Sequence, residues 1–200
     1  MRLLTSTDYK IMPWKNGLGQ TTELVKSPQS VNSETPLQWR LSIADVPGSG
    51  PFSIFPNTDR IIIQLDGPPM TLSHGAASPA KNLNKNEPYA FSGEWTTHCE
   101  VDGPARDFNI LVDHRFFRAS ADVTELSSGQ EVRIPLRGTV AIIHLLEGNA
   151  HLADPSRNAT IDLSAPTTLI WDSPDAPSHV TVKSGTDTVS FVVISLGKTG

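Results

Sequence analysis

The sequence of 200 residues contains a single cysteine and lacks long hydrophobic runs. Because Cys99 has no companion, the chain can form neither an internal disulfide nor a zinc site made of several cysteines. The apolar segments are short and separated by turn residues, so none is long enough to cross a bilayer. The first residues, MRLLTSTDYK, lack the apolar stretch and cleavage site of a secretory signal. These absences predict a cytoplasmic protein that does not enter a membrane.

Basic clusters and metal-ligating patterns are also missing. The chain has 16 basic and 21 acidic residues, a formal net charge of -5, and its Lys and Arg residues are scattered. Nucleic-acid binding needs a clustered basic face, so we exclude that class of function. No two of the six histidines are separated by a single residue, and no HExxH occurs. We therefore expect no bound metal and no other cofactor.

Strand patterns dominate what is present. Sixteen prolines and fourteen glycines divide the chain into short apolar segments, which is typical of an all-β protein. The clearest alternation runs from Trp39 to Ala44, where apolar residues occupy one face and Arg40 and Ser42 the other. Further strands are predicted over residues 21–26, 60–65, 108–112, 140–146, 167–171 and 189–196.

A weak internal repeat predicts the architecture. Residues 61–67 (IIIQLDG) match residues 142–148 (IIHLLEG) at an offset of 81 residues. Aromatic residues follow the two glycines at similar intervals, Phe91 and Phe108 after the first, Trp171 and Phe191 after the second. Two copies of one β-module predict two small barrels, residues 1–115 and residues 116–200, because closing a sheet removes its exposed edges. The alternative is a single irregular β-sandwich.

The loop from Pro13 to Glu23 has the composition of a binding loop. It joins Trp14, Lys15 and Asn16 to a glycine turn directly before a strand. Glycines allow close backbone approach to a ligand, successive amides can hold an anion, and the two polar side chains supply further donors. The alternative is that Asn16 and Gly17 form only a hairpin turn and that Trp14 is a core residue.

Arg40 and Arg60 lie in otherwise apolar strands, where an unpaired guanidinium is costly. Asp107 and Asn109 share one strand face, and Asp107 could pair with either arginine. The other acceptor for these arginines is a ligand carboxylate, which fits the planar guanidinium fork. A mixed arrangement, with one arginine held by Asp107 and the other open to a ligand, satisfies both possibilities.

Four sequence blocks resemble the signatures of the HutD/Ves family in order and spacing. They are Met12 to Gly17, Trp39 to Asp45, Gly50 to Pro56 with Asp59-Arg60, and Gly103-Pro104 with Asp107 to Asn109. The resemblance covers about the first 115 residues and implies a bicupin fold of two tandem cupin-like (RmlC-like) barrels and a role in bacterial histidine utilisation. Leu18 departs from the family loop, which usually has a glycine there.

Together with this resemblance, the residues predict a pocket in the first barrel. Its ligand-binding residues are Trp14, Lys15, Asn16, Arg40, Arg60, Phe91, Asp107 and Asn109. The first hypothesis is a regulatory protein that binds a small anionic metabolite such as urocanate or a formyl- or formimino-glutamate. The second is a metal-independent isomerase or hydrolase acting on such a metabolite, and the third is a protein-interaction module. Oligomeric state stays open, a homodimer included.

Overall fold

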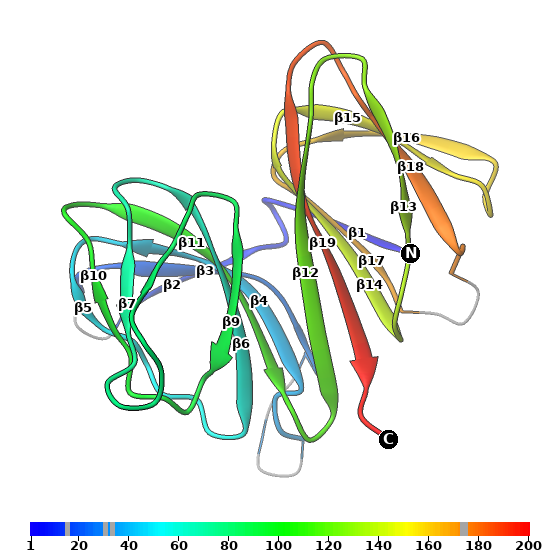
Figure 1. Ribbon diagram of the computed structural model, residues 1–200. Coiled ribbons are helices and arrows are strands. Elements are labelled where there is room, and N and C mark those ends of the chain that lie inside the picture. The colour runs from blue at the N-terminus through cyan, green and yellow to red at the C-terminus, as the bar shows by residue number, and fades with distance from the viewer. Residues whose placement is uncertain (15–16, 30–31, 33–34, 173–175) are drawn as a thin grey trace. The chain divides into compact units, whose positions relative to one another are not determined.

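The computed structural model describes residues 1–14, 17–29, 32, 35–172 and 176–200 (Figure 1). These residues form strands and turns and no helix, so the described part of the chain has no helix able to span a membrane. The chain divides into two compact units. One comprises Tyr9–Arg118 with Thr199 and is called the first barrel below. The other comprises Met1–Asp8, Ala119–Lys198 and Gly200 and is called the second barrel.

The first barrel consists of a six-stranded and a four-stranded antiparallel sheet. The larger sheet has the order β2 (Lys10–Pro13), β3 (Gln20–Ser27), β4 (Trp39–Val46), β11 (Ala105–Asp113), β6 (Thr58–Asp66) and β9 (Pro88–Ser92). The smaller has the order β5 (Gly50–Pro51), β10 (His98–Glu100), β7 (Thr71–Ser73) and β8 (Lys81–Asn82). Apolar side chains from both sheets, among them Ile62 and Leu72, pack in one cluster between them.

The second barrel has a five-stranded and a four-stranded sheet. The order of the larger is β1 (Arg2–Thr5), β17 (Thr167–Trp171), β14 (Val140–Glu147), β19 (Val189–Lys198) and β12 (Phe117–Leu126). The order of the smaller is β13 (Glu131–Pro135), β18 (His179–Ser184), β15 (Asn149–Asp154) and β16 (Ala159–Ser164). Trp171 and Phe191 are the largest side chains of the apolar cluster between these sheets, and the barrel also buries polar residues, among them His144, Thr168 and Asp154.

The predicted repeat appears as the same strand order in both barrels. The order β4, β11, β6, β9 in the first corresponds to β12, β19, β14, β17 in the second. Gly67 and Gly148 follow β6 and β14 with φ of 91° and 83°, and the pairing register shifts near each of them. The tandem-barrel fold predicted from the repeat is therefore the observed one.

The predicted division into residues 1–115 and 116–200 differs from the observed units at the N-terminus. Strand β1 pairs with β17, with Arg2 opposite Ile170, so residues 1–8 belong to the second barrel. The pairing fills the edge of the five-stranded sheet, which protects an otherwise open strand. It joins segments more than 160 residues apart, and no local pattern in the sequence indicates such a contact.

Candidate functional site

Five of the predicted site residues come together on four adjacent strands of the six-stranded sheet, β4, β11, β6 and β9. Leu111 of β11 lies opposite both Arg40 of β4 and Arg60 of β6. Because side chains alternate along a strand, both arginines point to the same face as Asp107 and Asn109. Phe91 lies opposite Arg60 on β9 and joins the cluster of apolar side chains between the two sheets. Arg40, Arg60, Phe91, Asp107 and Asn109, together with the rings of Phe52 and Phe55 described below, are called the arginine cluster.

Arg60 is buried and held by Asn109. Its Nε donates to Asn109 Oδ1 at 2.9 Å, and its second terminal nitrogen donates to the same oxygen. The guanidinium carbon lies 4.4 Å from the ring centre of Phe52 and 5.4 Å from that of Phe91. Burial lowers the pKa of Arg60 to about 10, the nearby Asp107 opposes this shift, and Arg40 adds to it. The group is a cation at neutral pH.

Asp107 completes a chain of three polar side chains. Asn109 donates its amide N–H to Asp107 Oδ1, which turns the amide oxygen toward Arg60. A direct pair between Asp107 and an arginine was one of the alternatives, and for Arg60 the structure instead places Asn109 between the two side chains. The reason lies in the register: Asn109 is two residues nearer than Asp107 to Leu111, the residue opposite Arg60.

Burial raises the pKa of Asp107 to about 6 from its ordinary value of 3.8, although Arg60 and the Asn109 hydrogen bond oppose the shift. The folded state then holds this proton more tightly than the unfolded chain. As the pH rises from about 4 to about 6, the contribution of Asp107 should therefore lower the free energy of unfolding by up to about 3 kcal/mol. Asp107→Asn should remove that contribution. Urea unfolding of both proteins across this range measures it, and an identical pH dependence would contradict the assignment.

Arg40 differs from Arg60 in having an unused donor. Its Nε is buried and has no hydrogen-bond partner among the described residues. Its guanidinium carbon lies 5.6 Å from the ring centre of Phe55, and the side chain is partly exposed. Burial lowers the pKa of Arg40, and the charge of Glu23 opposes the shift. The cluster thus contains one arginine whose Nε–H is taken by Asn109 and one whose Nε–H is left to donate.

The barrel lining next to Phe91 contains a histidine whose two ring nitrogens are both used. His74 Nδ1 lies 2.9 Å from Thr97 Oγ1, and Nε2 lies 3.1 Å from the Tyr89 hydroxyl. Thr97 donates to the Trp95 carbonyl, so His74 Nδ1 carries the proton and Nε2 accepts from Tyr89. Burial lowers the pKa of His74, which favours this neutral form.

Cupin barrels often hold a metal through histidines and a carboxylate. The donor set here does not fit such an ion. His74 has no free ring nitrogen, and the described residues contain no group of three or more histidine, cysteine or acidic side chains placed to bind one.

Of the predicted loop residues, Lys15 and Asn16 lie outside the described residues. Trp14 donates its indole N–H to Thr21 Oγ1 at 2.9 Å and packs against the apolar cluster. Thr21 pairs with Ala44, near the C-terminal end of β4, whereas Arg40 lies near the N-terminal end of that strand. Trp14 and Arg40 are therefore at different ends of β4. The Gly17 N–H donates to the Trp14 carbonyl at 2.9 Å, which removes this amide from the predicted anion-holding loop.

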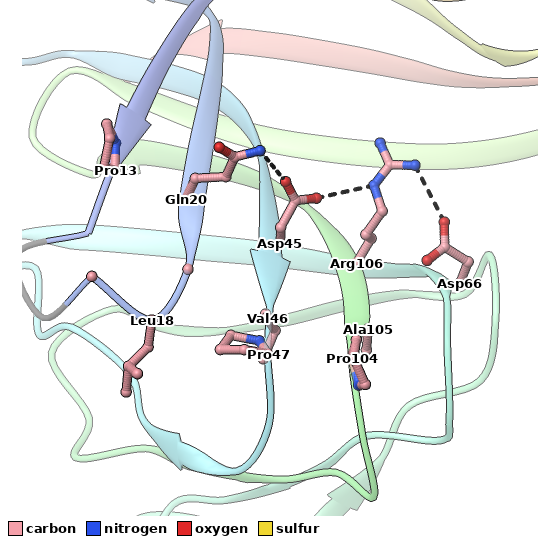
Figure 2. Close-up of a pocket in the computed structure, with 12 residues that line it drawn as sticks. Pro13, Leu18, Gln20, Asp45, Val46, Pro47, Asp66, Pro104, Ala105 and Arg106 are labelled. Atoms are coloured by element: carbon pink, nitrogen blue, oxygen red, sulfur yellow. Dashed lines mark hydrogen bonds and ion pairs between the residues drawn. The ribbon is translucent and has the colours of Figure 1, made fainter.

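The same loop lines a pocket of about 620 Å³ at the ends of β2, β3, β4, β6 and β11 (Figure 2). Figure 2 shows a polar row of Gln20, Asp45, Arg106 and Asp66 above an apolar wall. The wall is formed by Leu18, Val46, Pro47, Pro104 and Ala105, and Pro13 lies on the other side of the row, near Gln20. We call it the rim pocket. It lies at the Val46 end of β4, whereas Arg40 lies at the other end.

Sequence reasoning missed two parts of this arrangement. Phe52 and Phe55 lie over the two arginines, although both were visible within the Gly50 to Pro56 block. The polar row of the rim pocket combines residues from four strand ends, and only their pairing brings them together. The available signal was an acidic residue at the ends of β4 and β6, Asp45 and Asp66, the two strands that flank β11.

These features define a protein of the cupin fold. Oxalate decarboxylase from Lactobacillus farciminis, determined as a formate complex, superposes with a TM-score of 0.68 at 8% identity, over 96% of this chain and 85% of that one. At this identity the similarity shows the fold alone. The chain belongs to the HutD family, whose profile matches residues 6–189.

Relatives support the family assignment. A Pseudomonas putida protein, known as an uncharacterized 21.2 kDa protein in the hutC 3′ region, is 41% identical over 120 residues, 60% of this chain and 62% of that protein. The match therefore spans less than two thirds of that relative. Protein Ves of Cronobacter sakazakii is 32% identical over 74% of this chain and 78% of its own length. HutD from Pseudomonas fluorescens SBW25, solved in a formate condition, has a TM-score of 0.78 at 25% identity over 100% of this chain and 99% of that one.

Proposed function

We propose that this chain is a cytoplasmic, regulatory protein of histidine utilisation that binds a small anionic pathway metabolite at the arginine cluster. The observation that carries the proposal is the buried Nε–H of Arg40, which has no acceptor among the described residues. An unsatisfied buried donor on a cationic group costs more than an ordinary lost hydrogen bond. A ligand carboxylate would satisfy it in the bidentate geometry that guanidinium groups prefer.

The charges around Arg40 support an anion rather than a cation. Arg40 lies near enough to Arg60 for its charge to lower the pKa of Arg60. Two positive groups therefore share one face of the sheet. Asp107 is linked to Arg60 through Asn109 and offsets one of these charges. The charge of Glu23 reaches Arg40, but its carboxylate forms an ion pair with Lys26 at 3.3 Å. The remaining positive charge favours a carboxylate.

The surroundings of the two guanidinium groups fit a ligand with an apolar or conjugated body. Phe52, Phe55 and Phe91 place three rings around them. Urocanate combines a carboxylate with a conjugated ring of this kind, whereas the formyl- and formimino-glutamates offer two carboxylates for the two guanidinium groups. The family name and the hutC-region relative supply the pathway. The proposal assigns the ligand to the first barrel, because both arginines that lie in apolar strands belong to it.

Titration calorimetry with urocanate, N-formyl-glutamate and N-formimino-glutamate tests this function. At least one of them should bind the wild-type protein with a dissociation constant below about 1 mM. Arg40→Ala should weaken that binding about tenfold or more, because a hydrogen bond to a charged group is lost. Arg137→Ala, an exposed arginine of the second barrel, is the matched control and should bind normally. Absence of binding in the wild type, or an unchanged affinity in Arg40→Ala, would refute the proposal.

A second candidate is a metal-independent enzyme acting on the same metabolites. The favouring observation is Asp107, whose pKa of about 6 suits proton transfer near neutral pH. Incubation of the protein with each metabolite, followed by mass spectrometry, separates the two functions. Binding without any product supports the regulatory protein, whereas product formation that Asp107→Asn abolishes supports the enzyme.

A further inference from the structure

The rim pocket is separate from the arginine cluster and has its own chemistry. Its volume of about 620 Å³ lies in the range of small-molecule sites. Val46 and Ala105 line it and also belong to the buried apolar cluster that contains Phe91. Apolar packing therefore lies between the rim pocket and Arg60, so a ligand in one site need not touch the other.

The polar row of the rim pocket carries more negative than positive charge. Arg106 Nε lies 3.2 Å from Asp45 Oδ1, and its NH1 lies 3.3 Å from Asp66 Oδ2. Gln20 Nε2 donates to Asp45 Oδ2 at 2.7 Å. One guanidinium thus faces two carboxylates, and both oxygens of Asp45 are used. The second oxygen of Asp66 and the amide oxygen of Gln20 make no contact drawn in Figure 2, and both are hydrogen-bond acceptors.

Among the described residues, the rest of the pocket offers few donors. Pro13, Pro47 and Pro104 line it, and a proline has a carbonyl acceptor but no N–H. In the adjoining loop, the N–H groups of Trp14 and Gly17 donate to the carbonyls of Gly19 and Trp14. An anion would meet two carboxylates and few available amides. A cation would meet acceptors and an excess of negative charge.

The wall opposite the polar row is apolar and open to solvent. Leu18 is 69% exposed, and Pro47 and Pro104 are exposed as well. Burial of such side chains against a ligand is favourable in proportion to the apolar area removed from water. The pocket therefore combines a hydrophobic shelf with an acceptor-rich edge, as Figure 2 shows.

From this arrangement we propose that the rim pocket is a second ligand site, selective for a small organic cation that carries N–H donors on an apolar body, such as an amidinium or a primary ammonium. The cationic group lies at Asp66, at one end of the polar row, and the apolar body lies over Leu18, Pro47 and Pro104. The first barrel then has two sites of opposite charge preference, the arginine cluster for an anion and the rim pocket for a cation.

Three probes of nearly equal size and different charge test the proposal: benzamidinium, neutral benzamide and benzoate. They are titrated to about 10 mM, where ligands of this size bind, and the backbone amide signals of Gln20 and Arg106 are followed by NMR. Benzamidinium should shift these signals with saturation, and added salt should weaken it. Benzamide and benzoate should bind several-fold more weakly. Equal binding of all three probes, or no shift with benzamidinium, would overturn the proposal.

Matched variants locate the cation. Asp66→Asn should weaken benzamidinium binding by about 1.5-fold to fivefold, the range for a solvent-exposed ion pair. Asp122→Asn, an exposed carboxylate of the second barrel, should leave the affinity unchanged. Arg40→Ala should also leave it unchanged, which distinguishes this site from the proposed anion site. Unaltered affinity in Asp66→Asn, or loss of benzamidinium binding in Arg40→Ala, would count against the assignment.

Discussion

Arg60→Met lowers the free energy of unfolding by about 3–5 kcal/mol, because removal of one partner leaves a buried charge without compensation. Arg60 donates to Asn109, which in turn donates to Asp107, a residue with no exposed surface. Methionine preserves much of the side-chain volume between Phe52 and Phe91 but provides no cation. The pKa of Asp107 then rises further, so the destabilisation is larger at pH 8 than at pH 5. Urea unfolding at the two pH values measures both effects.

The matched control for this prediction is Arg106→Met. Arg106 also faces two carboxylates, but its side chain is 48% exposed. The side chains of Asp45 and Asp66 are exposed to a similar degree, 41% and 50%. Ion pairs of this kind contribute at most about 1 kcal/mol. A loss in Arg60→Met as small as that in Arg106→Met would show that the chain from Arg60 to Asp107 is not a stabilising network.

Gly67→Ala destabilises the first barrel by about 3 kcal/mol or more, because strain and a backbone clash act together. Gly67 has a φ of 91°, and a Cβ there would lie 2.5 Å from the Cα of Ala105 and 2.5 Å from the carbonyl oxygen of Pro104. Both are backbone atoms of the segment entering β11, so neither can move aside as a side-chain end could. Thermal or urea unfolding of the purified variant measures the loss.

Gly129→Ala separates strain from clash. Gly129 has a comparable φ of 75°, but a Cβ at that position meets no atom within 4 Å. The expected cost is only the strain of about 1–2 kcal/mol. Gly148, the counterpart of Gly67 in the repeat, would place a Cβ 2.4 Å from the Thr188 carbonyl oxygen and should behave like Gly67. Similar losses in Gly67→Ala and Gly129→Ala would exclude the close backbone approach as the cause.

The fold was predictable because the sequence carries its main features locally. Period-two alternation placed β4, and the predicted strand over residues 167–171 coincides with β17. The repeated acidic-glycine ends of β6 and β14 fixed corresponding strands in the two barrels. The pairing of β1 with β17 was not predictable, because a four-residue strand carries too little pattern to identify a partner so distant in sequence.

The candidate site was predictable only in part. Arginines within apolar strands need a nearby acceptor, and this reasoning selected Arg40, Arg60, Asp107 and Asn109, which the structure places on one face. Which acceptor serves which arginine depends on register, so the intermediate position of Asn109 could not be read from the sequence. The rim pocket depends on the strand ends meeting in space.

The most direct test of the central claim follows the side-chain Nε–H signals of the arginines by ¹H–¹⁵N NMR while a pathway anion that binds is added. Arg40 Nε–H, buried and unpartnered among the described residues, should shift strongly and exchange more slowly with water once the carboxylate accepts it. Arg60 Nε–H, already donated to Asn109, should change little. Saturation of the protein with the anion while the Arg40 signal stays unchanged would contradict the account.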